Sequence, residues 1–230
     1  MARILLIETS TARLSAALSE DGVVTAFRVC DEPRMQASLT APYVKEVLDE
    51  KHLTMKDLDA VCVGRGPGSY TGLRVGVSTA KGLCFGAGIP LLSVGTLDTL
   101  VSEAHRLDAV PDGCKYVVPM IDARRMEVYS ALFTPDGRQL TETKPIIVEA
   151  ASFGDQLAEG PVLFIGDGAL KCRETLASDH AFFTEAYPDA RAMAPLAETA
   201  YHEKRFEDVA YFEPFYLKDF VATVSRKKLF

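Results

Sequence analysis

The residues of this sequence best placed to do chemistry are a glycine-rich segment, residues 64–72, and two acids that end predicted strands. The segment stands between a predicted strand and a predicted helix. Its backbone N–H groups would therefore point at the helix N-terminus, where an anion can bind. A strand-end carboxylate could hold a metal ion or act on a water molecule. The candidate contacts for a nucleotide or anion are Glu8, Ser10, Gly66, Gly68, Ser69 and Asp122.

The glycine-rich segment does not match either of the two common phosphate-binding patterns. Gly72-Leu73-Arg74 stands where a P-loop needs Gly-Lys-Ser/Thr. Gly66-x-Gly68-x-x-Thr71 misses the dinucleotide fingerprint, and no acid follows at the required distance of about twenty residues. A tight strand-to-helix turn without a ligand is therefore an equal alternative. Ser69 has no obvious histidine partner, so capping the following helix is its simpler role.

The acids and histidines also have structural interpretations. Glu8 could be hydrogen-bonded by the turn Thr9-Ser10-Thr11, and Asp122 could form an ion pair with Arg124 or Arg125. The sequence has neither metal-binding histidine spacings nor a G-x-S-x-G elbow, so it predicts no metal site and no serine hydrolase chemistry. The isolated histidines are His52, His105, His180 and His202.

Small residues recur along the helix predicted for residues 71–85. Gly72, Gly76, Ala80 and Cys84 are spaced by four and predict a smooth stripe on one helix face. The stripe could pack on the protein's own sheet or against a helix of a second chain, with Tyr70, Leu73 and Val77 adding apolar contact. If it faces a second chain, Gly76→Leu should disrupt partner binding more than folding.

Composition narrows the classes of function. The chain has 230 residues, a net charge of −7 and a pI near 5.2, which argues against broad, unaided binding to nucleic acid. No apolar run approaches the length of a membrane helix, and the first run ends at Glu8, too short for a signal peptide. The five cysteines are scattered and odd in number. These features predict a reduced, cytoplasmic protein without a membrane partner.

The order of predicted elements indicates an α/β fold that contains a duplication. Strands at residues 4–8, 14–19 and 23–30 form a meander, and helices and strands alternate up to residue 105. A second strand-rich half follows, with further helices near 151–158, 169–178 and 191–206. Two such halves suggest the duplicated ribonuclease-H-like, actin-like (ASKHA) fold, with mixed sheets flanked by helices. We expect subdomains at 1–106 and 107–230, the last helix and tail packing back on the first.

Four motifs make the whole chain resemble the TsaB family, formerly called YeaZ, most densely over residues 1–130. They are Ile7-Glu8-Thr9-Ser10-Thr11, the thirteen-residue run Gly64-Arg65-Gly66-Pro67-Gly68-Ser69-Tyr70-Thr71-Gly72-Leu73-Arg74-Val75-Gly76, Ile121-Asp122-Ala123-Arg124 with Glu127-Val128-Tyr129, and the closing motif Pro214-Phe215-Tyr216-Leu217-Lys218. One departure is Glu8, where most relatives have aspartate and the catalytic relative TsaD has glutamate, so a residual polar role for that site stays open.

The resemblance implies an actin-like fold and a non-catalytic role. The family assists TsaD, the catalytic subunit, and TsaE, an ATPase, in transferring a threonylcarbamoyl group to the tRNA adenosine 3′ of the anticodon. It implies a homodimer when alone, only indirect contact with tRNA through the complex, no cofactor of its own, and ATP or ADP at the complex interface. The residues expected to bind the partner are Tyr43, Val47, Tyr70, Leu73, Arg74, Gly76, Val77 and Ala80.

A motif difference from TsaD bears on that role. TsaD-type proteins carry a histidine metal motif in the helix after the first meander, and residues 35–43 of this chain contain no histidine. The same resemblance makes older glycoprotease or M22 peptidase names misleading.

The alternative that the residues leave open is an actin-fold ATPase or kinase that works alone, with phosphate at the glycine turns and magnesium at Glu8 or Asp122.

Overall fold

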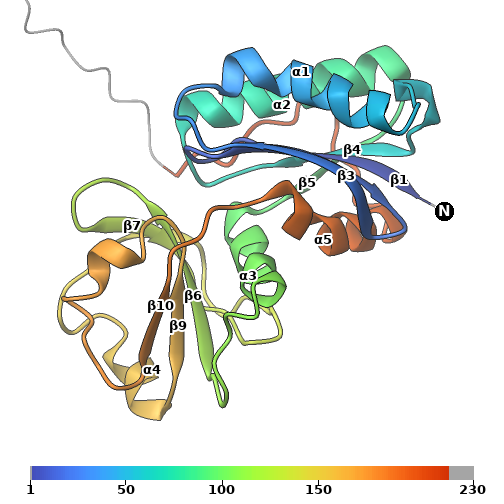
Figure 1. Cartoon of the computed structure of the whole chain (residues 1–230). Helices are drawn as coiled ribbons and strands as arrows, with labels where there is room; N and C mark the ends of the chain where they lie inside the picture. Colours follow the sequence, from blue (N-terminus) through green and yellow to red (C-terminus); the bar gives the residue numbers. More distant parts are fainter. Residues whose placement is uncertain (1, 218–230) are drawn as a thin grey trace, which may run out of the picture.

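The computed structural model describes residues 2–217 and contains two five-stranded mixed sheets (Figure 1). The first has the order β3-β2-β1-β4-β5 and the second the order β10-β9-β6-β7-β8. Their strands are β1 (Arg3–Glu8), β2 (Leu14–Glu20), β3 (Val23–Cys30), β4 (Ala60–Gly64), β5 (Leu91–Val94), β6 (Tyr116–Asp122), β7 (Glu127–Ser130), β8 (Lys144–Ile147), β9 (Val162–Ile165) and β10 (Ala181–Thr184). Lys218 of the closing motif and the basic run at 226–228 lie outside the described residues.

The two sheets repeat one topology. In the first, β1, β2 and β3 form an antiparallel meander, and β4 and β5 continue in parallel from β1. In the second, β6, β7 and β8 form the meander, and β9 and β10 continue in parallel from β6. The predicted duplication of a ribonuclease-H-like unit is therefore confirmed.

Helices cover both faces of the first sheet. The helices are α1 (Gln36–Glu50), α2 (Tyr70–Ala87), α3 (Thr96–Arg106), α4 (Gly154–Glu159) and α5 (Ala190–His202). Alternate residues of β1 face opposite sides, as strand geometry requires. Leu5 and Ile7 pack under α1 and α2, whereas Ile4 and Leu6 pack against α5. Figure 1 shows α1 and α2 above this sheet and α5 below it.

Two helices cross between the halves of the chain. Helix α3 precedes residue 107, yet Leu97, Leu100 and Val101 pack with β6 and β9 of the second sheet. Helix α5 comes after the second sheet in sequence and packs on the first. The subdomain boundary between residues 106 and 107 stays a prediction, but α3 and α5 each pack on the sheet of the other predicted subdomain. The return of the last helix to the first sheet is as expected.

Several predicted elements were too long. The helix expected near residues 169–178 is wrong: only a 3-10 turn, Leu170–Cys172, forms there. The buried residues Ala169, Cys172 and Leu176 have a spacing that is typical of a helix. In the structure, separate turns with i+3 and i+4 hydrogen bonds bury them without a continuous helix. Within the predicted strand-rich half, residues 138–148 contain only the short strand β8. Among residues 2–217, no helix combines the length and apolar character needed to cross a membrane.

The small-residue stripe of α2 faces its own subdomain. Ala80 and Cys84 lie in the core beneath the helix. A Cβ atom on Gly72 would overlap the Thr9 carbonyl oxygen, and one on Gly76 would overlap Thr9 Oγ1. The glycines therefore allow α2 to approach the turn after β1, so Gly76→Leu should damage folding directly instead of acting mainly on partner binding, as the stripe had indicated.

Burial corrects most of the expected partner-binding residues. Five of the eight are buried and pack inside the chain, so they offer no surface to a partner: Val47, Leu73, Gly76, Val77 and Ala80. Tyr43 is half-buried, whereas Tyr70 and Arg74 reach the surface. Only these last three stay candidates for direct contact, and their binding stays a prediction.

Gly76→Ala and Gly82→Ala form a matched pair that tests this packing. The methyl group at Gly76 collides with Thr9, so we expect a loss of about 1–3 kcal/mol in unfolding free energy. The methyl group at Gly82 meets open space, so we expect a gain of up to about 1 kcal/mol from helix propensity. Urea titrations of both variants measure the difference. Equal stability would show that α2 does not rest on Thr9.

Candidate functional site

The glycine-rich segment is packed against the turn that follows β1. Ser69 N donates to Ser10 O over 2.7 Å, and Gly72 N donates to Ser69 Oγ over 3.3 Å, which caps α2. A Cβ atom on Gly68 would overlap the Ser10 carbonyl oxygen. These two amides bond within the protein, which supports the interpretation of the segment as a tight strand-to-helix turn, while its contacts with an anion stay a prediction.

Other chain segments close the same turn from the outside. Thr96 N, at the start of α3, donates to Gly66 O over 3.0 Å. Phe215 N, near the C-terminus, donates to Arg65 O over 2.7 Å. Gly66 has a φ of +105° and lies against the Phe215 carbonyl, a conformation and a distance that favour glycine. The turn thus joins α2, α3 and the closing motif.

Glu8 is a fully buried carboxyl at the end of β1. Its Oε1 accepts from Ser10 N over 2.6 Å, which supports the interpretation that the turn holds the carboxyl. Its Oε2 lies against Gly64, where a Cβ atom would overlap it, and has no hydrogen-bond partner among residues 2–217. Burial raises the pKa of Glu8 above its usual value, although hydrogen bonds from Ser10 oppose that shift.

Asp122 lies at the equivalent end of β6 in the second sheet. It pairs with Lys171, not with Arg124 or Arg125 as we expected, although Arg124 N donates to its Oδ1 over 3.1 Å. Asp122 N donates to Asp167 Oδ1 over 2.9 Å, and burial raises the pKa of Asp167 to about 6. No hydrogen bond or ion pair within residues 2–217 joins Asp122 to Glu8, so the structure does not bring the two acids into one network.

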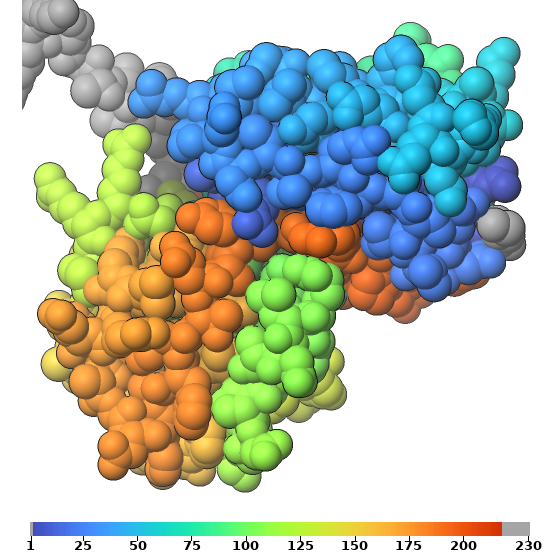
Figure 2. All heavy atoms as spheres, viewed as in Figure 1, coloured from blue at the N-terminus to red at the C-terminus, as the bar shows by residue number. Residues whose placement is uncertain are grey.

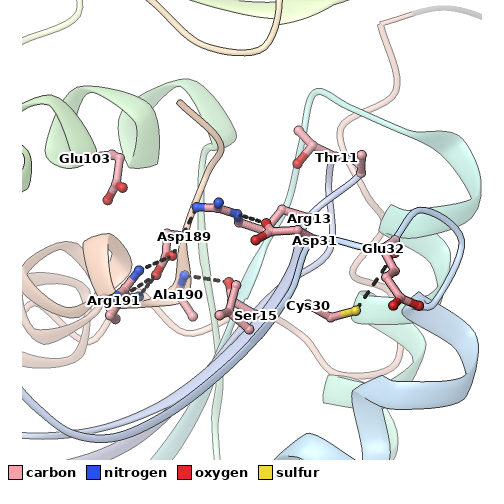
Figure 3. A network of polar contacts seen from close by, with 12 residues as sticks. Thr11, Arg13, Ser15, Cys30, Asp31, Glu32, Glu103, Asp189, Ala190 and Arg191 are labelled. Atoms are coloured by element: carbon pink, nitrogen blue, oxygen red, sulfur yellow. Dashed lines mark hydrogen bonds and ion pairs between the residues drawn. The ribbon is translucent and has the colours of Figure 1, made fainter. Parts of the chain in front are cut away.

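A polar network that the sequence did not predict joins the first sheet to α5 (Figure 3). Asp189 caps α5, is fully buried and pairs with Arg191 over 2.8 Å. Arg13 lies between Asp31, at 2.6 Å, and Asp189, at 3.8 Å. Burial alone would raise the pKa of Asp189, but the hydrogen bonds and charge of Arg191 hold it below its usual value. Arg13, Asp31 and Asp189 are far apart in the sequence, so no local sequence pattern could predict this network.

The outward faces of α1 and α2 form a second feature that sequence reasoning missed. The first half of α1 exposes short side chains and its second half exposes charged ones, and on α2 the exposed positions include Arg74, Ser78, Gly82 and Phe85. Phe85 is 85% exposed, and open space surrounds the position of a Cβ on Gly82. The exposed residues of α1 are Ala37, Ser38, Ala41, Pro42, Lys45, Glu46, Asp49 and Glu50. The i, i+4 spacing of Ser78, Gly82 and Gly86 was the sequence pattern that could have predicted this exposed face.

The C-terminal segment borders this helical face. Lys81 Nζ donates to the Ala210 and Phe212 carbonyls over 3.1 and 2.9 Å, and the rings of Tyr70 and Tyr216 lie 5.1 Å apart. A hollow of about 290 Å³ lies between α2 and this segment. Helices α1 and α2 and residues 209–217 thus form one outward layer over the first sheet.

Metal ligands are not clustered in the part of the chain that is described. Residues 2–217 contain no group of three or more His, Cys, Asp or Glu side chains placed to hold one ion. Cys62 and Cys84 are buried free thiols, and burial raises the pKa of both; that of Cys84 is about 11. They are apolar core residues rather than reactive thiolates.

Duplicated ribonuclease-H-like sheets with exchanged helices define a protein of the actin-like class. An activator of the 2-hydroxyisocaproyl-CoA dehydratase from Clostridium difficile, solved with bound ADPNP, shares this fold alone (TM-score 0.50, 7% identity, 88% of this chain and 96% of that chain). YeaZ from Pseudomonas aeruginosa is much closer, with a TM-score of 0.83 and 27% identity over 94% of this chain and all of that one.

Sequence comparison gives the family. The model described as "TsaD: tRNA N6-adenosine threonylcarbamoyltransferase" matches residues 34–225. The tRNA threonylcarbamoyladenosine biosynthesis protein TsaB of Escherichia coli is 34% identical, with 96% of each chain covered. The TsaB of Haemophilus influenzae is 30% identical over 98% of this chain and 96% of its own. The chain belongs to the TsaB family, as its motifs predicted.

Glu8→Gln tests the buried carboxyl through the pH dependence of stability. A folded pKa above the unfolded value of about 4.5 means that the contribution of Glu8 is complete at low pH and declines as pH rises through the folded pKa. Thermal midpoints measured from pH 4 to pH 8 should therefore fall for the wild type relative to Glu8→Gln as pH increases. A constant difference between the two proteins would contradict the burial argument.

Proposed function

We propose that this chain is the non-catalytic subunit of a cytoplasmic complex that makes threonylcarbamoyladenosine in tRNA. In that role it pairs with the TsaD homologue, which performs the transfer to the adenosine 3′ of the anticodon, and works with the TsaE homologue. The relatives named for this biosynthesis match nearly the whole chain, which supports the process. The chain alone is not an enzyme in this proposal.

The outward face of α1 and α2 is the observation that carries the docking proposal. Exposed Ser38 and Ala41 on α1 and Ser78 and Gly82 on α2 provide short side chains on the outer faces of both helices, alongside longer exposed residues such as Lys45 and Arg74. Two such helices let a partner's helices approach closely, and the exposed Phe85 ring supplies an apolar anchor at the end of α2. The partner surface is therefore the face opposite to the stripe that the sequence indicated.

The turn at residues 64–72 has a structural part in this proposal. Ser69 fixes the start of α2, and Gly72 and Gly76 seat that helix on the turn after β1, so the outward ridge is held on a rigid support. The engagement of the turn amides within the chain argues against an autonomous ATPase or kinase. ATP or ADP, in this proposal, is held at the interface of the complex and not by this chain alone.

Homodimerisation follows from the same surface. A chain without its partner leaves the ridge of α1 and α2 exposed, and a second copy can cover it through a two-fold symmetric contact. We expect the homodimer and the complex to exclude each other. We also expect tRNA to be reached only in the complex, since the net charge of −7 disfavours unaided binding.

Gly82→Leu tests docking on this face. The side chain enters open space in the isolated chain, so folding should be preserved, but it blocks close helix approach. We expect Kd for the TsaD homologue to rise at least about tenfold, roughly 1.4 kcal/mol, with loss of the homodimer. Light scattering and calorimetry measure both, and threonylcarbamoyladenosine in tRNA from complemented cells reports the function.

Thr199→Leu is the matched control. It places the same side chain at an exposed position of α5, on the opposite face of the first sheet, and should leave both associations unchanged. Wild-type affinity in Gly82→Leu would reject the α1 and α2 face as the docking surface. A wild-type chain that never associates with the TsaD homologue would reject the proposed function itself.

A further inference from the structure

Two adjacent arginines occupy the tip of the hairpin between β6 and β7. Arg124 and Arg125 are the only neighbouring pair of arginines in the sequence, and both are exposed. Figure 2 shows the segment coloured for residues near 125 projecting from the body of the second subdomain. Neither side chain forms an ion pair with any of residues 2–217. Within the described residues 2–217, the tip therefore presents two exposed guanidinium groups without an ion-pair partner.

The acids beneath the tip are already engaged. Asp122 pairs with Lys171 and accepts from Arg124 N, and Asp167 accepts from Asp122 N. Lys171 Nζ also donates to Glu127 O over 2.7 Å, which ties the end of the hairpin to the turn after β9. These contacts fix the base of the hairpin and use none of the guanidinium nitrogens of Arg124 and Arg125.

The backbone of the tip is one that arginine adopts poorly. Arg124 has a φ of +73° and Arg125 a φ of +50°. Glycine and asparagine accept this left-handed conformation most easily, and they are the usual residues of tight hairpin turns. Two consecutive arginines here are unfavourable for local folding. Such strain at exposed residues points to a role for the side chains themselves.

We propose that Arg124 and Arg125 bind phosphate groups of the tRNA when this chain stands in its complex. The planar guanidinium fork matches phosphate oxygens and stays charged at every physiological pH. RNA is favoured over an acidic protein surface because the relatives of this chain are named for modifying a tRNA. The inference rests on the proposed function, and it adds a direct contact that forms once the partner has captured the tRNA.

The test variant is Arg124→Asn/Arg125→Gly, which removes both charges and suits the positive φ angles. We expect its melting temperature to equal or exceed that of the wild type, since the turn is relieved of strain. Its complex with the TsaD homologue should assemble normally but bind tRNA more weakly. Two lost phosphate contacts mean that raising salt from 50 to 200 mM weakens the wild-type complex about 7- to 12-fold more than the variant complex.

Arg138→Ala/Lys144→Ala is the charge-matched control. It removes two exposed cations from the same subdomain, and β8 pairs Lys144 with Ser130, at the end of β7 away from the tip. Its salt dependence should match that of the wild type. Titration of each complex with fluorescent tRNA at four salt concentrations gives the slopes, and light scattering confirms assembly.

Two results would overturn the inference. Equal slopes for the assembled variant and wild-type complexes would show that the tip does not contact RNA, while leaving the proposed function intact. The variant could instead assemble less well, with a loss of tRNA affinity that only matches the loss of complex. That result would assign the arginines to an acidic surface of the partner protein. Failure of the wild type to assemble at all would be a failure of the proposed function, seen by light scattering before any RNA is added.

Discussion

The close approach of α2 to the turn after β1 is the constraint on which this structure depends. Thr9 Oγ1 donates to Gly72 O over 2.8 Å, and Gly76 leaves the space that Thr9 occupies. A side chain at either glycine would push the helix away from the sheet. Because α2 starts at the glycine-rich turn, the same contact also fixes Ser69 and the loop before it. The outer ridge of the helix is positioned as a consequence.

Closing the turn in this way changes what the first subdomain can do. An actin-like fold places loops at the carboxyl ends of its central strands, where nucleotides bind in many α/β proteins. Here the Ser69 and Gly72 amides of that turn bond to Ser10 and Ser69, and Glu8 fills the space beside Gly64. The glycines serve close packing between chain segments. The surface of this subdomain that remains exposed is the outer layer formed by α1, α2 and the C-terminal segment.

The two subdomains are joined by more than the chain between them. Helix α5 returns to the first sheet, α3 packs on the second, and where α5 begins the half-buried Arg13 and Arg191 pair with the buried Asp189. A buried carboxylate with paired arginines is costly to separate, because each charge would be left without its partner. The outward face of α1 and α2 and the arginine hairpin therefore stand on one connected framework.

The sequence by itself determined the repeated α/β order, the family, the turn at residues 64–72 and the candidate acids, because strand and helix periodicities and motif spacings are local. It did not determine which face of α2 is buried: Gly72, Gly76 and Ala80 and the outer residues Ser78 and Gly82 have the same four-residue spacing. Only tertiary packing against Thr9 decided that. Tertiary structure likewise decided that Lys171, forty-nine residues away, pairs with Asp122, since folding alone brings such distant charges together.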